Sequence, residues 1–522
     1  MSTADPATRS PGDFQVLQAR LAAIWRSLES ERPEPHTSII VPALSFDPEE
    51  LAKIQGVSFY EERLLFSLIR LRDPRATLVY ITSQPLHPEI VDYYLGLLRG
   101  VSARSARSRL HLLCLYDSTP ISLTQKILDR PRLIRRITEL VRDPSRAYLT
   151  CFNSSDLERR LAVEIGVPLN GADPEVLWTG TKSGSRKVFD EAGVAQTPGF
   201  GDIHSEAEVL DALAELKARD PGLTRAVLKL DESFAGAGNA LYRYPAGASP
   251  GRSQLRRALD ELVLATDESA ASYLAKLESM GGIVEAFVEA RDLRSPSTQV
   301  RIQPDGSLAL ISTHDQVLGG AAGQTYLGCR FPADDAYRFQ IQDAALRVGA
   351  VLQRHGVVSR FGVDFLVHPT GDGSWRCLAV EINLRMGGTT PPFMALQFLT
   401  GGRLDPETGL YTSARGVRKF YYATDNLRSP SYHGLLPEDF SDIRAAYGLD
   451  FDTYRETGAV FHMIGSLSQF GKIGVTCIGD SAGESMEIYR RVVAALDREG
   501  HGSEPPSKKR LHPFEVAAQG ME

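Results

Sequence analysis

Residues 360–388 read RFGVDFLVHPTGDGSWRCLAVEINLRMGG, and this stretch decides the fold. Apolar and polar residues alternate in its first and last parts, and the turn sequence Gly371-Asp372-Gly373 separates them. Alternation with a period of two is typical of strands that bury one face, and a tight glycine turn joins neighbouring antiparallel strands. The stretch therefore predicts a buried β-hairpin.

Three polar side chains of this hairpin, Asp364, Glu381 and Asn383, can project from one face toward one point. Two carboxylates and an amide oxygen suit a hard cation such as Mg²⁺, which commonly shares its coordination sphere with substrate phosphates; they suit zinc or copper poorly. We interpret the trio as a nucleotide-metal site. The alternative is a solvated hairpin with acidic outward positions, but apolar neighbours such as Phe365 and Leu378 favour a buried sheet.

Length and composition indicate a multidomain globular protein. The 522 residues suggest roughly three or four domains, and 43% hydrophobic with 24% charged residues is ordinary for such a protein. A net charge of −7 argues against nucleic acid as the main ligand. The five cysteines form no Cys-x-x-Cys pair, and no signal peptide or membrane-length apolar run is visible, so we expect a cytoplasmic protein that does not contact a membrane.

Short apolar runs alternate with segments of helical periodicity between residues 38 and 152, which predicts a parallel sheet covered on both faces. From Thr179 the pattern changes to helix, strand, glycine loop and strand, and then to antiparallel strands with one long helix. The fold class is therefore a chain of α/β and α+β domains. The predicted units are a leader with a helix (1–33), the parallel-sheet domain (34–177), a small lobe (178–282), a large lobe (283–418), a C-terminal domain (419–497) and a disordered tail (498–522).

A predicted strand ends at Lys229 and leads directly into the loop 231–239, DESFAGAGN. Small residues let backbone N–H groups approach an anion closely, and a lysine at the strand end supplies a point charge. We interpret the segment as a phosphate clamp that includes Ser233, Gly236 and Gly238. A flexible hairpin loop is the alternative; a P-loop is excluded because no Gly-Lys-Ser/Thr closes the segment.

Lys182 stands at the start of a predicted helix. A lysine there opposes the helix macrodipole, so the position is unfavourable for stability unless an anion neutralises the charge. This favours an anion-binding role for Lys182.

Glu285 interrupts a short apolar strand, residues 281–288. Its carboxylate could accept a hydrogen bond from an exocyclic amine while neighbouring backbone groups meet a purine edge. A surface glutamate on an edge strand is the alternative.

Taken together, these motifs resemble the ATP-grasp superfamily over roughly residues 180–388, in both type and order. The resemblance implies that ATP lies between two α+β lobes behind a Rossmann-like domain. It assigns the ATP phosphates to Lys182 and Lys229, the adenine to Glu285, Ala286, Phe287 and Val288, the ribose to Asp292, and magnesium (with manganese as an alternative) to Asp364, Glu381 and Asn383.

A second resemblance extends from about residue 38 to 496 and is to the pheganomycin-type peptide ligases and related amino-acid ligases of bacterial natural-product pathways. The segments that carry it are YEERLL (60–65), GTKSGSR (180–186), LGG (318–320), YLGCRFPA (326–333) and FGKIGVTCIGD (470–480). It implies ATP-dependent joining of a carboxylate to an amine through an acyl phosphate, with release of ADP and phosphate. Alternatives are a small-molecule kinase on the same scaffold, a non-catalytic nucleotide-binding protein, and an adenylate-forming ligase.

Two arginines are candidates to hold a substrate carboxylate, Arg385 in its Asn-x-Arg context and Arg301, because guanidinium binds carboxylate in a bidentate fork. A small-residue segment after a predicted strand is a candidate wall of the acceptor pocket, with a surface loop as the alternative: His314, Asp315, Gln316, Gly319 and Gly320. The expected partners are a small-molecule acid and an amine; a homodimer is left open.

Overall fold

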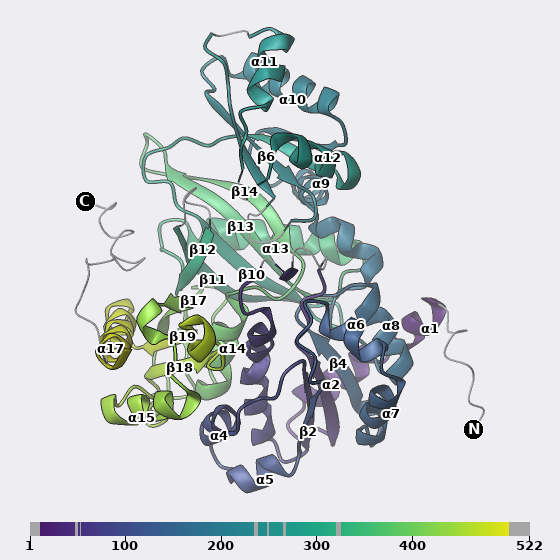
Figure 1. Ribbon diagram of the computed structural model, residues 1–522, viewed down its shortest axis with the longest axis vertical. Helices are drawn as coiled ribbons and strands as arrows, with labels where there is room; N and C mark the ends of the chain where they lie inside the picture. Colours follow the sequence, from purple (N-terminus) through teal and green to yellow (C-terminus); the bar gives the residue numbers. More distant parts are fainter. Residues whose placement is uncertain are drawn as a thin grey trace.

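The computed structural model describes residues 11–46, 51, 52, 54–233, 238–247, 250–264, 268–319 and 325–500. In Figure 1 the small lobe lies at the top, the hairpin of the large lobe below it, and the N-terminal domain at the lower right. No helix within the described ranges is both long and apolar enough to cross a membrane.

The N-terminal domain contains the predicted parallel sheet. Its strands are β1 (His36–Val41), β2 (Ala76–Thr82), β3 (Leu110–Cys114) and β4 (Ala147–Cys151), and they lie in the order β3-β2-β1-β4. All neighbouring strands are parallel. The helical elements around the sheet are η2 (Val57–Arg72, a 3-10 helix), α4 (Pro88–Gly96), α5 (Ala103–Arg107), α6 (Leu123–Leu128), α7 (Pro131–Leu140) and α8 (Asp156–Ile165).

Both faces of this sheet are buried, as the continuous apolar runs predict. Ile39 and Val79 pack in the core that includes α6, α7 and α8, whereas Ile40 and Leu78 pack with η2 and α4 on the other face. The predicted helix of the leader is two helices, α1 (Pro11–Gln18) and α2 (Leu21–Glu29).

The small lobe is a five-stranded sheet with the order β5-β9-β6-β7-β8, in which all pairs are antiparallel. Its elements are β5 (Gly199–Ile203), α10 (Glu206–Arg219), β6 (Arg225–Leu230), β7 (Asn239–Arg243), α11 (Arg252–Leu259), β8 (Val263–Leu264), α12 (Ala270–Met280) and β9 (Gly282–Ala286). Strands β6 and β7 form the predicted hairpin around the glycine loop, with Lys229 opposite Asn239.

The large lobe has an eight-stranded sheet, in the order β14-β13-β10-β11-β12-β17-β19-β18. The elements of its first part are β10 (Pro296–Ile302), β11 (Leu308–Gly319), β12 (Thr325–Phe331), α13 (Arg338–Arg354), β13 (Arg360–Pro369), β14 (Trp375–Asn383) and α14 (Thr390–Thr400). The quoted stretch is the antiparallel hairpin β13–β14, as predicted. The side chains of α13 and of the strands beside it form one apolar core.

The C-terminal segment continues this sheet, whereas the sequence suggested a separate domain from residue 419. Its elements are β17 (Phe420–Arg428), α15 (Pro437–Tyr447), β18 (Gly458–His462), α16 (Ser466–Phe470), β19 (Lys472–Gly479) and α17 (Ala482–Gly500), after a small pair β15 (Arg403–Leu404) and β16 (Tyr411–Thr412). Strand β17 pairs with β12, so the segment shares the backbone hydrogen bonds of the large lobe. Helix α17 runs to Gly500, and the rest of the predicted tail lies outside the described residues.

Candidate active site

Helix α9 (Lys182–Ala192) joins the two lobes at the place where the predicted residues meet. Its first turn is fixed on both sides, because Ser183 N–H donates to Asp231 of the small lobe (2.7 Å) and Ile382 N–H of β14 donates to Ser185 Oγ (3.0 Å). The Thr181 side chain caps the helix by accepting from Gly184 N–H (2.9 Å). These contacts hold the start of α9 over the acidic hairpin.

The acidic hairpin gathers its polar side chains as the alternation predicts. Asp364 lies directly opposite Glu381 in the β13–β14 register. Asn383 Nδ2 donates to Asp364 Oδ2 (2.9 Å) and to Glu381 Oε1 (3.0 Å). Gln316 Nε2 of β11 donates to Asp364 Oδ1 (2.8 Å), so one residue predicted for the acceptor pocket lies instead beside the carboxylates.

Lys182 contacts one of these carboxylates, and the charge of Lys229, whose ammonium pairs with Glu285, acts on the same carboxylate. Lys182 Nζ lies 2.8 Å from Glu381 Oε2. Burial would raise the pKa of Glu381, but Lys182 and then Lys229 outweigh it and lower this pKa to about 2. The charge of Lys229 thus also reaches Glu381. The cationic side chains and the acidic hairpin therefore belong to one site between the lobes.

The donor set fits a cation that takes part of its coordination sphere from a ligand. Among the described residues no three His, Cys, Asp or Glu side chains gather closely enough to hold a metal ion by themselves. Asp364 and Glu381 supply two carboxylates, and phosphate oxygens would supply further ligands, as Mg²⁺ in nucleotide sites prefers. Asn383 turns its Nδ2 toward the carboxylates, so the amide must rotate before its oxygen can serve as a ligand.

We expect Asp364→Asn to stabilise the ligand-free protein at high pH. Burial and then the charge of Glu381 raise the pKa of Asp364 from 3.8 to about 7. A raised carboxyl pKa contributes stability that is complete below the unfolded pKa and is lost as pH rises through the folded pKa. The variant removes this loss, so its free energy of unfolding should exceed the parent's by up to about 4 kcal/mol near pH 8, the value of about three pKa units, and by little near pH 4. Urea denaturation at both pH values measures the difference; one that does not change with pH would contradict this electrostatic account.

The carboxylate of Glu285 is buried and hydrogen-bonded to three side chains. Glu285 is 2% exposed, and it accepts hydrogen bonds from Arg186 Nη1 (2.6 Å), Lys229 Nζ (2.7 Å) and Thr197 Oγ1 (2.5 Å). In the absence of a ligand this buried carboxylate offsets one of the two positive charges of Lys229 and Arg186. The predicted contact with adenine stays a prediction, to which the structure adds this second role. Sequence reasoning missed Arg186, although it lies four residues after Lys182 and thus on the same helix face.

The other residues predicted to bind adenine or ribose follow Glu285 along the chain. The N–H groups of Ala286 and Phe287 already donate to Pro198 and Arg225 carbonyls (2.8 and 3.1 Å), and the half-buried Val288 follows them. Asp292 is exposed and pairs with Arg294 (3.1 Å), and its predicted contact with the ribose stays a prediction.

The glycine loop is only partly described. Ser233 Oγ donates to Leu230 O (3.2 Å), and Gly238 follows at the start of the return strand. Gly236 and its neighbours, residues 234–237, lie outside the described residues. The phosphate clamp therefore stays a prediction.

The predicted acceptor segment lies mostly inside strand β11, which continues to Gly319 where the sequence suggested a loop after residue 313. His314 is 0% exposed and its Nε2 lies 2.6 Å from Tyr421 Oη; burial lowers its pKa to about 3. Asp315 accepts from Tyr337 Oη (2.6 Å). Gly319 ends the strand, and Gly320 lies outside the described residues.

Arg385 lies at the edge of the acidic hairpin. Its Nη2 donates to Asn383 Oδ1 (2.7 Å), and burial lowers its pKa while Glu381 and Asp364 oppose this effect. Arg301 lies on β10, where its Nη2 donates to Asn170 Oδ1 (2.9 Å). Both arginines line one cavity between the N-terminal domain and the large lobe.

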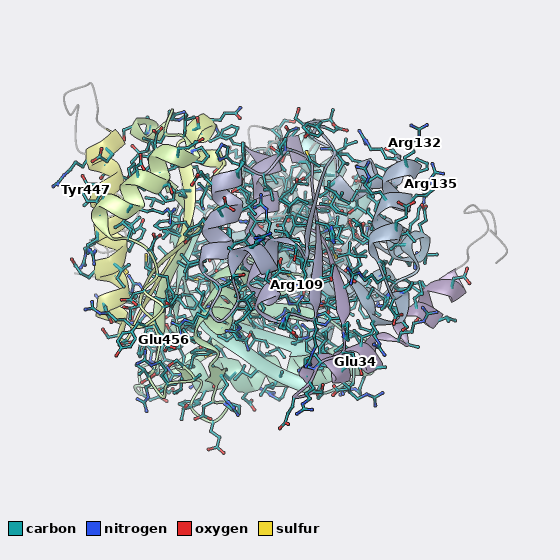
Figure 2. The ribbon with its side chains drawn as sticks, turned by 90° about the horizontal axis from the view of Figure 1, so that it is seen from below. Glu34, Arg109, Arg132, Arg135, Tyr447 and Glu456 are labelled. Carbon is teal, nitrogen blue, oxygen red and sulfur yellow. The ribbon has the colours of Figure 1, made fainter. Side chains whose placement is uncertain are left out.

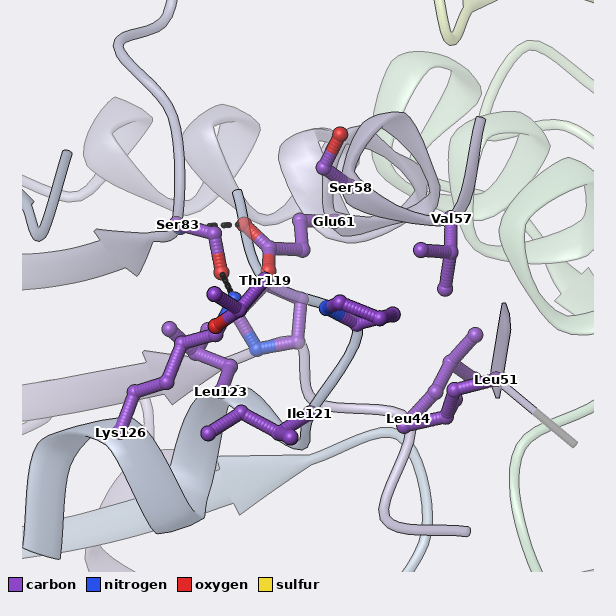
Figure 3. A pocket seen from close by; sticks show the side chains of 12 residues that line it. Leu44, Leu51, Val57, Ser58, Glu61, Ser83, Thr119, Ile121, Leu123 and Lys126 are labelled. Atoms are coloured by element: carbon purple, nitrogen blue, oxygen red, sulfur yellow. Dashed lines mark hydrogen bonds between the residues drawn. The ribbon is translucent and has the colours of Figure 1, made fainter. Parts of the chain in front are cut away.

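A separate pocket lies at the carboxyl ends of β1 and β2, where open parallel sheets commonly place ligands. Figure 3 shows its polar side: Ser83 N–H donates to Glu61 Oε2 (2.6 Å), and Lys126 Nζ donates to Ser83 Oγ (3.0 Å). Burial raises the pKa of Glu61 to about 7. Its polar groups pair with each other, and none of them belongs to the site between the lobes.

Two known families match parts of the sequence. The family described as IQCH-like, ATP-grasp matches residues 174–243 and 266–407, which include the lysines and the acidic hairpin. The PGM1 C-terminal domain family matches residues 445–492.

Individual relatives extend the likeness to nearly the whole chain. L-propargylglycine–L-glutamate ligase of Streptantibioticus cattleyicolor is 32% identical over 474 residues, which cover 88% of this chain and 94% of the relative. IQ motif-containing protein H of Danio rerio is 21% identical over 93% of this chain, which spans 50% of that longer protein. The crystal structure of an N5-carboxyaminoimidazole ribonucleotide synthetase with ADP shares the fold, with a TM-score of 0.50 and 12% identity over 89% of this chain and 98% of that one. The chain therefore belongs to the ATP-grasp ligases.

Proposed function

We propose that the protein uses ATP and Mg²⁺ to join the carboxylate of one small molecule to the amine of an amino acid or short peptide, in the biosynthesis of a natural product. The observation that carries the proposal is the 2.8 Å contact between Lys182 and Glu381, with the charge of Lys229 reaching the same carboxylate. The relationship to an L-propargylglycine–L-glutamate ligase supports amino acids as the substrate class.

The residues of the site suit phosphorylation of a carboxylate. A carboxylate oxygen is a poor leaving group, so it first attacks the γ-phosphorus of ATP; ADP leaves and an acyl phosphate remains. The amine then attacks the acyl carbon, and phosphate leaves with the carboxyl oxygen. Lys182, Lys229 and Arg385 would neutralise the charge that gathers as the two anions meet, which is the main catalytic demand of phosphoryl transfer.

Bound Mg²⁺ would neutralise further phosphate charge beside Asp364 and Glu381. If the Asn383 amide rotates so that its oxygen faces the ion, this oxygen no longer accepts the hydrogen bond from Arg385. Arg385 then has a guanidinium N–H available for the substrate carboxylate or the transferred phosphate. Metal binding and substrate binding would thus be linked through the side-chain amide of Asn383.

Trapping with hydroxylamine tests the reaction. Incubation with ATP, Mg²⁺, a substrate acid and hydroxylamine should give the hydroxamate of that acid together with one ADP per hydroxamate. AMP in place of ADP would indicate an adenylate-forming ligase. A stable phosphorylated product that neither hydroxylamine nor an amine captures would indicate a kinase, and absence of nucleotide turnover with a broad panel of acids and amines would favour a binding protein.

A further inference from the structure

Two adjoining cavities lie between the N-terminal domain and the large lobe. The cavity that Arg385 lines also includes Arg301 and Arg360, and its empty volume is about 340 Å³, part of which is open to solvent. A neighbouring cavity of about 440 Å³ is lined by Arg70 of η2 and again by Arg301 and Arg360. Because the two share lining residues, they connect the edge of the acidic hairpin with Arg70.

The charges of these arginines are not balanced by acidic groups. No aspartate or glutamate lines either cavity within the described part of the chain. Arg70 donates to Ser38 Oγ (3.2 Å) and Arg301 to the Asn170 amide oxygen, both of which are neutral. The Arg360 side chain makes no hydrogen bond or ion pair with the residues that the structure describes, although its backbone pairs with β10. The cavities thus present three cationic groups without counter-ions.

The arrangement is unfavourable without a ligand. Arg301 and Arg360 lie directly opposite each other on β10 and β13, where like charges destabilise a sheet. Burial, and then the charges of Arg360 and Arg70, lower the pKa of Arg301 to about 9. The exposed Glu29 opposes this shift but forms no ion pair with Arg301. Burial and then Arg70 lower the pKa of Arg360 to about 10.

Buried donors without partners surround the same guanidinium. Arg301 is 6% exposed, and its Nε has no hydrogen-bond partner among the residues that the structure describes. The same holds for Tyr148 Oη and for Trp25 Nε1, and the Trp25 ring lies 4.1 Å from the Arg301 guanidinium carbon. Buried polar groups without partners are rare in native proteins, and they often mark a place for a ligand or water.

We propose that Arg70, Arg301 and Arg360 bind a second carboxylate of the acid substrate, the one that does not react. The inference rests on the proposed ligase function and deepens it. Arg385 would hold the carboxylate that is phosphorylated, and the adjoining cavity holds the other, so the acid substrate is a dicarboxylate such as an acidic amino acid. Three guanidinium groups favour a carboxylate because it accepts two parallel N–H···O bonds from each fork.

Monoamides of dicarboxylic amino acids test this assignment. Aspartate, glutamate and 2-aminoadipate serve as acids in the hydroxylamine assay, each beside its two monoamides. One monoamide of the preferred acid lacks the reacting carboxylate and should give no hydroxamate. The other lacks only the second carboxylate and should react with a KM about 10- to 100-fold higher. Equal KM values for this monoamide and the dicarboxylate would overturn the proposal.

The variant Arg360→Gln tests whether the second carboxylate binds in the cavity that Arg70, Arg301 and Arg360 line. It should raise KM for the dicarboxylate about 10- to 100-fold, with kcat within about threefold, and leave KM for the reactive monoamide unchanged. Arg360→Lys should restore part of the loss. The matched control is Arg132→Gln on helix α7, an exposed position at the surface in Figure 2, which should change neither KM. An equal rise for both substrates in Arg360→Gln would contradict the assignment.

Two measurements without turnover separate this inference from the ligase proposal. Removing Arg360 relieves its repulsion with Arg301, so Arg360→Gln should raise the Tm of the ligand-free protein; a fall would indicate a structural role. Calorimetric titration with the three dicarboxylates should show binding to the parent and at least tenfold weaker binding to Arg360→Gln. If no acid gave hydroxamate yet this binding difference appeared, the ligase function alone would fail. If hydroxamate formed without the difference, the second-carboxylate site alone would fail.

Discussion

Glu381→Gln should lower kcat by about 10²–10³-fold, the range observed when one group that stabilises transition-state charge is removed. The substitution keeps the size of the side chain and an oxygen for the Asn383 hydrogen bond, but it removes the charge that pairs with Lys182. Asp364 is then the one carboxylate that the hairpin offers to Mg²⁺. Release of ADP in the presence of acid and hydroxylamine measures the loss, and it should be accompanied by weaker dependence of the rate on Mg²⁺.

The matched control is Glu278→Gln, on the exposed face of α12. The side chain of Glu278 is exposed and makes no hydrogen bond or ion pair within the described residues. This variant should retain the parental kcat. Near-parental turnover by Glu381→Gln would remove the acidic hairpin from the mechanism.

Lys229→Met should lower kcat/KM for ATP by about 10²–10³-fold while the protein stays folded. The variant removes one positive charge from the site between the lobes. Glu285 keeps its hydrogen bonds from Arg186 and Thr197, so the buried carboxylate is not left alone. The free energy of unfolding should therefore fall by at most about 2 kcal/mol, less than when a buried charge loses its whole environment.

Lys217→Met provides the control for burial of a lysine in the same lobe. Lys217 is 6% exposed, and within the described ranges its Nζ donates only to the carbonyl oxygens of Pro221 and Leu223 (2.8 Å each). Its replacement should lower stability and leave kcat/KM for ATP unchanged. Steady-state kinetics and thermal unfolding of both variants distinguish a phosphate ligand from a structural lysine; unchanged ATP kinetics in Lys229→Met would refute its assignment.

The acidic hairpin could be predicted because its information is local. Alternation of apolar and polar residues with a period of two places Glu381 and Asn383 on one face, and the tight turn brings Asp364 opposite. The parallel sheet could also be predicted from a local pattern, because its strands are continuous apolar runs separated by segments of helical periodicity. Lys182 was found for a physical reason as well, because a cation at a helix start needs an anion, and Glu381 is that partner.

What the sequence did not reveal depends on contacts between distant segments. The strand pairing of β12 with β17, nearly a hundred residues later, merges the C-terminal segment with the large lobe, and no local pattern specifies it. His314 and its neighbours were predicted to follow a strand and to form a pocket wall or a surface loop, although they continue β11. Arg360 opens the most informative stretch, yet its role depends on Arg301 and on η2 of another domain.

The location of the metal and nucleotide tests the central claim most directly. In a crystal structure with ADP and Mn²⁺, the anomalous signal of manganese should lie about 2.1 Å from oxygens of both Asp364 and Glu381. The ADP phosphates should lie between this ion and the ammonium groups of Lys182 and Lys229. Manganese and ADP at the pocket beside Glu61, or anywhere that leaves Glu381 paired only with Lys182, would contradict a shared phosphate-metal site between the lobes.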